Sequence, residues 1–340
     1  MHIGRQYKFT QFFGWTWREA AYLVGWSLLV TAILHFSRGN FLIIPAPILT
    51  GIGSALAIIL GFKNAQCYAR ANEALTLSGQ LTANSLILAN RLMSTVGTLE
   101  AAQSGPALRD MFYRHFAWLT ALRFFLRERK PWENMSEPGN AKFLARLPTP
   151  ESQSTLKDEL TKYLPDAELQ KVLSHRGDKE ALILSGQCEV IRDLYNKKLI
   201  SEFWLTFLIG TIDDLVRLQG ALKRIKNYPY ARNYYSIAVF LVMIFVALVP
   251  FGLFPHAQEL GKPTGIERWT VWLNVPFSAI VGWIFISLEK VGENSSNPFE
   301  GGANDVPISF IARRIEIEMR TMLGEQTDLK PIEPKENILF

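Results

Sequence analysis

Residues 41–62 read FLIIPAPILTGIGSALAIILGF, and residues 63–75, KNAQCYARANEAL, follow them without a break. The first stretch lacks charged side chains over the roughly 20 residues that a helix needs to cross the hydrocarbon core of a bilayer. It opens with Pro45 and Pro47, whereas the second stretch has the composition of a polar helix. Together they predict a membrane helix that continues directly into a charged helix, an arrangement that can line a path for water.

Three further segments are free of Asp, Glu, Lys and Arg over a similar length. The four candidate membrane helices are Ala20–Ser37, Phe41–Phe62, Asn233–Pro255 and Trp269–Leu288. The short connection Ser37–Asn40 makes the first two antiparallel neighbours, and His256–Arg268 joins the last two. An even number of crossings puts both ends of the chain on the same side of the membrane.

Lys and Arg are concentrated on one side of these candidate helices. Eleven flank the helices on the side of the termini and the central region, against three at the hairpin turns, Arg38, Lys262 and Arg268. Because cytoplasmic flanks are enriched in Lys and Arg, we expect both termini and the central region in the cytoplasm. Met1–Arg18 lacks the short apolar core of a cleavable signal. The sequence predicts an integral protein of the plasma (inner) membrane.

The chain divides by composition into four parts. We expect an N-terminal segment with two membrane helices (1–62), a helical cytosolic region (63–232), two further membrane helices (233–288) and a C-terminal cytosolic segment (289–340). The net charge of +5 is typical of a positive-inside membrane protein, so no nucleic-acid partner is needed to explain it. Cys67 and Cys188 both fall in the predicted cytosolic part, where neither a disulfide nor a metal cluster is expected.

The cytosolic part has the apolar spacing of helices and almost no strand signals. We expect the second membrane helix to continue to about Leu99 and to end at Ser104-Gly105-Pro106. Lys130–Thr155 is rich in Pro and Gly and is interpreted as a surface excursion. Further helices are predicted over 107–129, 155–164, 165–174, 179–194 and 203–226, and an amphipathic packing helix begins near Ile308. The fold class is therefore all-α.

Three blocks of the sequence resemble the bestrophin family. GIGSALAIILGFKNAQCYARANEAL, from Gly51, looks like the bestrophin signature, in which a Gly-Phe pair is followed by a basic residue, Asn and a Tyr-x-Arg pattern. DDLVRLQGALKRIKNYPY, from Asp213, is similar to the approach to the third membrane helix in bacterial members. NPFEGGANDVPI, from Asn297, resembles the block after the fourth. The resemblance covers essentially Pro45–Leu323.

The resemblance implies a homopentameric ion channel in the lipid bilayer, with one central pore that passes chloride or other small monovalent anions. The alternatives are a sodium or other monovalent-cation channel of the same fold, and a non-conducting membrane scaffold. Enzyme activity is not expected. The five histidines are scattered without metal-ligand spacing, no Ser or Cys nucleophile has a nearby partner in the sequence, and the sequence contains no glycine-rich phosphate loop. A secondary transporter would require charged residues inside the spans or broken helices in inverted repeats, and the four spans have neither.

Ser54, Ile58 and Phe62 are the candidate lining of the narrow part of the pore, the neck. They are four residues apart, so they lie above one another on one helix face. In a pentamer they would stack three rings, and narrow apolar rings gate by dewetting. The alternative is that Ile58 and Phe62 face lipid or a neighbouring helix. The family usually has a bulky apolar residue where this chain has Ser54, so we expect Ile58 and Phe62 to be the dominant constriction.

Three more residues are candidates along the pore. The resemblance places a second, cytosolic aperture at Phe203, with a core aromatic at a helix start as the alternative. Lys63 and Arg70 could make the inner mouth attractive to anions. For Arg70 we favour an ion pair with a carboxylate, either Glu73 or the neighbours Asp213 and Asp214.

Neither a cofactor nor a metal is expected. Animal bestrophins hold calcium in an acidic run after the Pro-Phe-Gly block, but Glu300–Asp305 keeps only two carboxylates of that run. A calcium ion prefers six to eight oxygen ligands. Calcium activation is therefore not expected.

Overall fold

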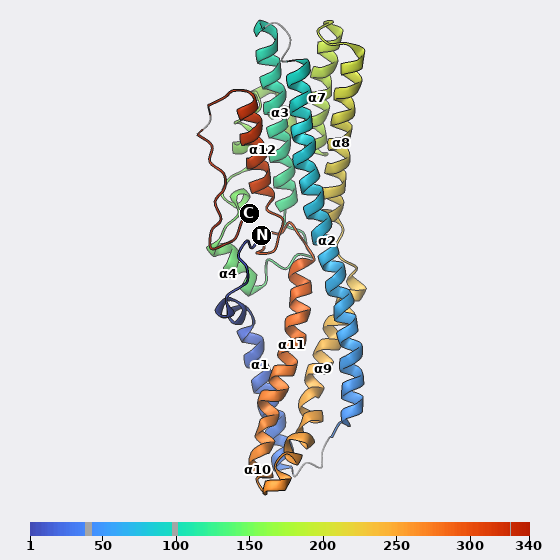
Figure 1. Ribbon diagram of the computed structural model, residues 1–340, viewed down its shortest axis with the longest axis vertical. Helices are drawn as coiled ribbons and strands as arrows, with labels where there is room; N and C mark the ends of the chain where they lie inside the picture. The colour runs from blue at the N-terminus through green and yellow to red at the C-terminus, as the bar shows by residue number, and fades with distance from the viewer. Residues whose placement is uncertain (38–42, 97–100, 327) are drawn as a thin grey trace. The chain divides into compact units, whose positions relative to one another are not determined.

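The computed structural model describes residues 1–37, 43–96, 101–326 and 328–340. Within these ranges the regular structure is helical, with only isolated β-bridges of Ile338 to His2 and to Lys335. Figure 1 shows the helices coloured from the N-terminus to the C-terminus. They are α1 (Phe9–Phe36), α2 (Ala46–Thr95), α3 (Ala101–Arg127), α4 (Pro138–Arg146), α5 (Leu156–Leu160), α6 (Asp166–Ser174), α7 (Lys179–Asn196), α8 (Glu202–Asn227), α9 (Arg232–Glu259), α10 (Glu267–Thr270), α11 (Asn274–Ser295) and α12 (Ile308–Met322), with 3-10 turns at Pro150–Ser152, Lys262–Thr264 and Val271–Leu273.

The chain forms two compact units. One, the membrane unit, comprises Gly4–Ala69 and Pro229–Ser296, and the other, the polar unit, comprises Met1–Ile3, Arg70–Tyr228 and Asn297–Phe340. The helix α2 contributes its first part to the membrane unit and its second part to the polar unit. The all-α fold class is confirmed.

Four helical segments of the described chain are long and apolar enough to cross a membrane. Each overlaps one of the four spans expected from the sequence, which confirms the prediction of an integral membrane protein. The turn predicted between the first two spans is not compared with the structure. Most of it, Arg38–Asn40, and the predicted start of the second span at Phe41 lie outside the described residues.

Within the membrane unit, α11 packs against both α1 and α9 (Figure 1). Small residues allow close approach of the helices. A Cβ atom added at Gly282 of α11 would lie 2.7 Å from Leu23 of α1, and one at Gly252 of α9 would lie 2.6 Å from Leu49 of α2. At these two glycines a larger side chain would collide with a leucine of the neighbouring helix.

A buried asparagine adds a polar contact among these helices. The side-chain amide of Asn274, which is fully buried, donates to the hydroxyl of Thr31 at 2.8 Å and to the carbonyl of Pro250 at 3.0 Å. Its oxygen accepts from the Ser278 hydroxyl at 3.0 Å. Asn274 thereby links α1, α9 and α11, in the manner of interhelical hydrogen bonds in membrane bundles.

The polar unit has a core of large side chains from α2, α3, α7 and α8. Trp118, Phe112 and Leu88 are fully buried in it. The Trp118 indole donates to the side-chain oxygen of Gln219 at 2.8 Å, so its polar atom is satisfied inside the core. Asp178 caps α7 by accepting from the backbone N–H of Ala181 at 3.0 Å, which is the usual role of an Asp at this position.

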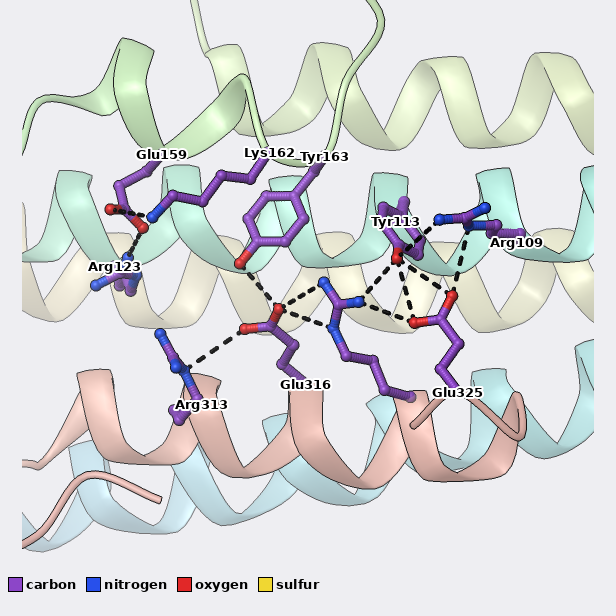
Figure 2. Close-up of polar contacts among 10 residues, drawn as sticks. Arg109, Tyr113, Arg123, Glu159, Lys162, Tyr163, Arg313, Glu316 and Glu325 are labelled. Carbon is purple, nitrogen blue, oxygen red and sulfur yellow. Dashed lines mark hydrogen bonds and ion pairs between the residues drawn. The ribbon is translucent and has the colours of Figure 1, made fainter. Parts of the chain in front are cut away.

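Polar side chains join α12 to α3 and to the segment after α5 (Figure 2). Glu316 of α12 accepts from the hydroxyl of Tyr163 at 3.0 Å and pairs with Arg320 at 3.0 Å. Arg320 donates to Tyr113 of α3 at 2.7 Å and pairs with Glu325 at 2.8 Å. The helix predicted from Ile308 is thus confirmed as a packing helix, with Ile308, Ile315 and Met319 on its buried face.

Two sequence expectations in this unit are wrong. Ser104-Gly105-Pro106 does not end a helix: α2 ends at Thr95, and Pro106 lies inside α3. Pro106 is the sixth residue of α3, where it removes one intrahelical hydrogen bond, and the helix continues to Arg127. The segment Lys130–Thr155 is more than a surface excursion, because it includes α4 and buries Glu151 against Arg123, with the two side chains 2.6 Å apart.

Candidate functional site

One face of α2 is exposed in the part that belongs to the membrane unit. Ser54 is exposed, and the side chains of Ile58 and Phe62 are 61% and 70% exposed. The opposite side of the helix is buried at Leu56 and Leu60. The structure therefore brings the three predicted neck residues onto one exposed face, as their four-residue spacing requires.

The buried positions of α2 repeat at intervals of three and four residues, apart from one interval of seven between Cys67 and Ala74. In chain order they include Leu49, Gly53, Leu56, Leu60, Lys63, Cys67, Ala74, Ser78, Leu81, Ser85, Leu88 and Leu92. Such a repeat of about 3.5 residues keeps one side of a long helix against its partners. The other side is consequently exposed over many turns.

In the polar unit the exposed face of α2 carries mostly small and uncharged side chains. From Thr76 onward the exposed residues are Thr76, Gly79, Gln80, Ala83, Ile87, Asn90 and Ser94, and Asn72, Glu73 and Leu75 are exposed before them. The exposed stripe from Thr76 to Ser94 is therefore uncharged. The sequence analysis did not identify these residues as candidates for the pore lining. The repeat of about 3.5 residues in their buried neighbours is visible in the sequence and would have predicted which side of the helix is exposed.

The glycines of α2 differ in what surrounds them. Gly51 and Gly61 are exposed and have no atom within 4 Å of an added Cβ. A Cβ at Gly53 would instead lie 3.0 Å from the ring of Phe245 on α9. Gly53 thus serves packing inside the protomer, while Gly51 and Gly61 leave a small surface on the exposed side.

Lys63 is buried, which changes its expected contribution to the inner mouth. Its ammonium lies 2.5 Å from Glu289 of α11, and the two side chains are 2% and 11% exposed. It also lies 4.3 Å from the centre of the Tyr235 ring. The positive charge of Lys63 is therefore balanced within the protomer by a carboxylate that the sequence analysis did not single out.

Arg70 binds backbone carbonyls at the end of α8. Its guanidinium donates to the carbonyls of Ile225 and Tyr228, where a cation stabilises the negative end of the helix dipole. Glu73, one of the carboxylates considered as its partner, accepts from Arg224 at 2.5 Å. Two hydrogen bonds of Arg70 thus run to the end of a helix.

Phe203 lies in the first turn of α8, and its side chain is 63% exposed. It stacks on Phe207 with ring centroids 5.2 Å apart, and the Arg91 guanidinium lies 4.3 Å from the centroid of the Phe207 ring. A core aromatic, the alternative reading, would be buried. An exposed, stacked ring at this position is compatible with an aperture residue.

The loop after α11 contains the carboxylates that were compared with the animal calcium site. Asp305 accepts from the backbone N–H of Gly301 at 2.6 Å, and the ammonium of Lys226 forms a buried ion pair with Glu133. Burial, followed by the charges of Asp305 and Glu133, raises the pKa of Glu300 to about 9. In the described residues no three His, Cys, Asp or Glu side chains are arranged to hold a metal ion.

These features define an all-helical integral membrane protein in which the three predicted neck residues share one exposed side of α2. A family model described as "Bacterial/Fungal Bestrophin protein" matches residues 13–321. The chain belongs to the bestrophin family.

Relatives and solved structures agree with this assignment. The chain is 28% identical over 277 residues to the "Voltage-dependent anion channel-forming protein YneE" of Salmonella typhi, covering 81% of this chain and 76% of that protein. It is 25% identical over 276 residues to the YneE protein of Escherichia coli K12, covering 81% and 75%. A crystal structure of a bacterial bestrophin homolog from Klebsiella pneumoniae has the same fold, with a TM-score of 0.73 and 20% identity over 91% of this chain and 98% of that one.

Proposed function

We propose that this chain is the subunit of an anion channel, and that five copies assemble around an axis lined by α2. The observation that carries the proposal is the exposed face of Ser54, Ile58 and Phe62 on an apolar helix in a member of the bestrophin family. The names of the relatives, voltage-dependent anion channel-forming proteins, support anions as the permeating species. Chloride and other small monovalent anions are the ions we assign to this pore, and we assign no enzyme activity.

The neck would work as an apolar constriction. Around a five-fold axis, Ile58 and Phe62 form two adjacent rings of hydrocarbon. An ion that passes a narrow apolar ring loses water ligands with no polar group to replace them, so small changes in ring diameter open or close the path. Ser54 forms a third ring with a hydroxyl lining, which is easier to hydrate. We therefore assign the main barrier to Ile58 and Phe62.

The exposed stripe of the polar unit would continue the path. Its uncharged side chains can exchange hydrogen bonds with water without binding an ion tightly, which favours rapid passage. Phe203 is the residue we propose for a second, cytosolic aperture, because its ring is exposed at the start of α8.

The orientation follows from the distribution of Lys and Arg. Both termini and the polar unit are proposed to lie in the cytoplasm, with the membrane unit in the plasma (inner) membrane. The two ends of the chain are in contact, since the backbone N–H of Leu339 donates to the carbonyl of Met1 at 2.9 Å. This contact supports the placement of both termini on the same side of the membrane.

Recording from purified protein in planar bilayers under asymmetric sodium chloride tests the proposal. Discrete current steps with a reversal potential near that of chloride are expected, together with a pentameric mass in detergent. A reversal potential near that of sodium would replace the anion assignment by the cation alternative. A silent pentamer would indicate a scaffold, and a stable monomer would refute the shared pore.

A further inference from the structure

The ion pair between Lys63 and Glu289 lies next to the neck. Lys63 directly follows Phe62 in α2, so their Cα atoms are about 3.8 Å apart. Its ammonium is 2.5 Å from a carboxylate oxygen of Glu289, and the Lys63 side chain is 98% shielded from solvent. One residue beyond the last neck ring, the chain therefore carries a buried lysine whose side chain is paired with a carboxylate.

The surroundings hold this pair in one geometry. The side chain of Asn64 donates to the carbonyl of Leu288 at 3.0 Å, which fixes α2 against α11 at the same level. A Cβ atom added at Gly292 would lie 2.2 Å from the Asn64 side-chain oxygen and 3.4 Å from Cε of Lys63. The absent side chain at Gly292 thus leaves the space that Lys63 and Asn64 occupy between the two helices.

Tyr235 and Glu293 complete the site. The ring of Tyr235 faces the Lys63 ammonium at 4.3 Å, a favourable cation–π distance. Its hydroxyl donates to Glu293 at 2.7 Å. The contacts of Lys63 therefore come from α9 and α11 of its own protomer, and its charge is directed away from the exposed face of α2.

We propose that Glu289 sets the ion preference at the Phe62 end of the neck by neutralising Lys63. This inference rests on the proposed function. An unpaired charge at position 63 would act on an ion in the neck across apolar surroundings, where electrostatic interactions are weakly screened. A pentamer would repeat the effect five times. Glu289 is thus a specificity-determining residue, although it does not line the pore.

Two single substitutions test the inference because they act in opposite directions. Glu289→Gln leaves Lys63 unbalanced and should raise the chloride-to-sodium permeability ratio. Lys63→Gln leaves Glu289 without its cation and, at a pH high enough to keep this buried carboxyl group ionised, should lower the ratio. Each change should be about tenfold or more, the effect of one unit charge about 10 Å from the ion at an effective dielectric constant of about 20. A merely structural role would not give shifts of opposite sign.

The chain offers a matched control. Glu19 and Lys290 form an ion pair of the same length, 2.5 Å, between α1 and α11. Glu19→Gln removes one charge from this neighbouring pair, whose side chains are 23% and 26% exposed, so water screens the remaining charge and the permeability ratio should change much less than in Glu289→Gln. The double variant Lys63→Gln and Glu289→Gln should return the ratio to that of the wild type.

The experiment is the reversal potential of each variant in planar bilayers under asymmetric sodium chloride, after its oligomeric mass has been checked. If a single variant does not assemble, the charge-reversed pair Lys63→Glu and Glu289→Lys keeps the ion pair and should show the wild-type reversal potential. A shift in the charge-reversed protein, or conducting single variants with unchanged reversal potentials, would overturn the inference. A silent wild-type protein would instead overturn the proposed function.

Discussion

Replacement of Glu300 by Gln should stabilise the polar unit at neutral and alkaline pH. Glu300 lies in the loop after α11, and its Oε1 atom is buried without a hydrogen-bond partner among the described residues. Burial is the largest cause that raises its pKa to about 9, and the charges of Asp305 and Glu133 add to it. The carboxyl group is therefore neutral in the folded protein at pH 7, whereas it is ionised in the unfolded chain.

The sign and size of the effect follow from this difference. A carboxyl whose pKa is higher in the folded state stabilises the fold fully below its unfolded pKa of 4.5, and the contribution is lost as the pH rises towards about 9. The slope for one proton is about 1.4 kcal/mol per pH unit. Between pH 6 and pH 8, Glu300 should thus lower the free energy of unfolding by up to about 3 kcal/mol.

Thermal unfolding in detergent micelles at pH 6 and pH 8 measures the effect. We expect the wild-type midpoint to fall by several degrees between these pH values, and Glu300→Gln to remove most of that fall. Glu318 is an exposed glutamate on α12, so Glu318→Gln is the control and should keep the wild-type fall. If the wild type and Glu300→Gln lose the same stability between pH 6 and pH 8, the assignment of a neutral, buried Glu300 is refuted.

Three further changes probe the neck and the buried polar contacts. Replacing Ile58 and Phe62 by Ala should raise the single-channel current or alter gating, because it widens the apolar rings. Lys226→Met should lower the free energy of unfolding by about 3–5 kcal/mol, measured by thermal unfolding, because it leaves Glu133 buried without its partner. Asn274→Leu should cost about 1–3 kcal/mol in the same assay, since it breaks hydrogen bonds among three membrane helices.

Controls separate these effects from general damage. Ile284 is an isoleucine of α11 whose side chain is 46% exposed, and Ile284→Ala should leave the current unchanged. Unchanged conductance and gating in the neck variant would contradict its assignment. The double variant Lys226→Met and Glu133→Leu should recover most of the lost stability, because it removes both buried charges. An Asn274→Leu protein with wild-type stability would show that this hydrogen-bonded contact does not stabilise the bundle.

Local patterns in the sequence were enough to predict most of the long helices. The helix expected over 203–226 is α8, Glu202–Asn227, and the uncharged spans predicted the membrane helices. Both signals are properties of neighbouring residues, namely helical periodicity and apolar length. The same signals failed at Pro106, because whether a proline ends a helix or sits near the start of the next depends on where that helix begins.

Ser54, Ile58 and Phe62 share a face of α2 by their spacing alone, and the sequence predicted that they would. The tertiary structure showed that this face is the exposed one and identified the partners of Lys63 and Arg70. Lys63 and Glu289 are 226 residues apart, so no local pattern could pair them. A charged side chain exerts its full electrostatic effect on a passing ion only if no opposite charge is paired with it in the folded protein. Which charges are paired depends on which helices pack together.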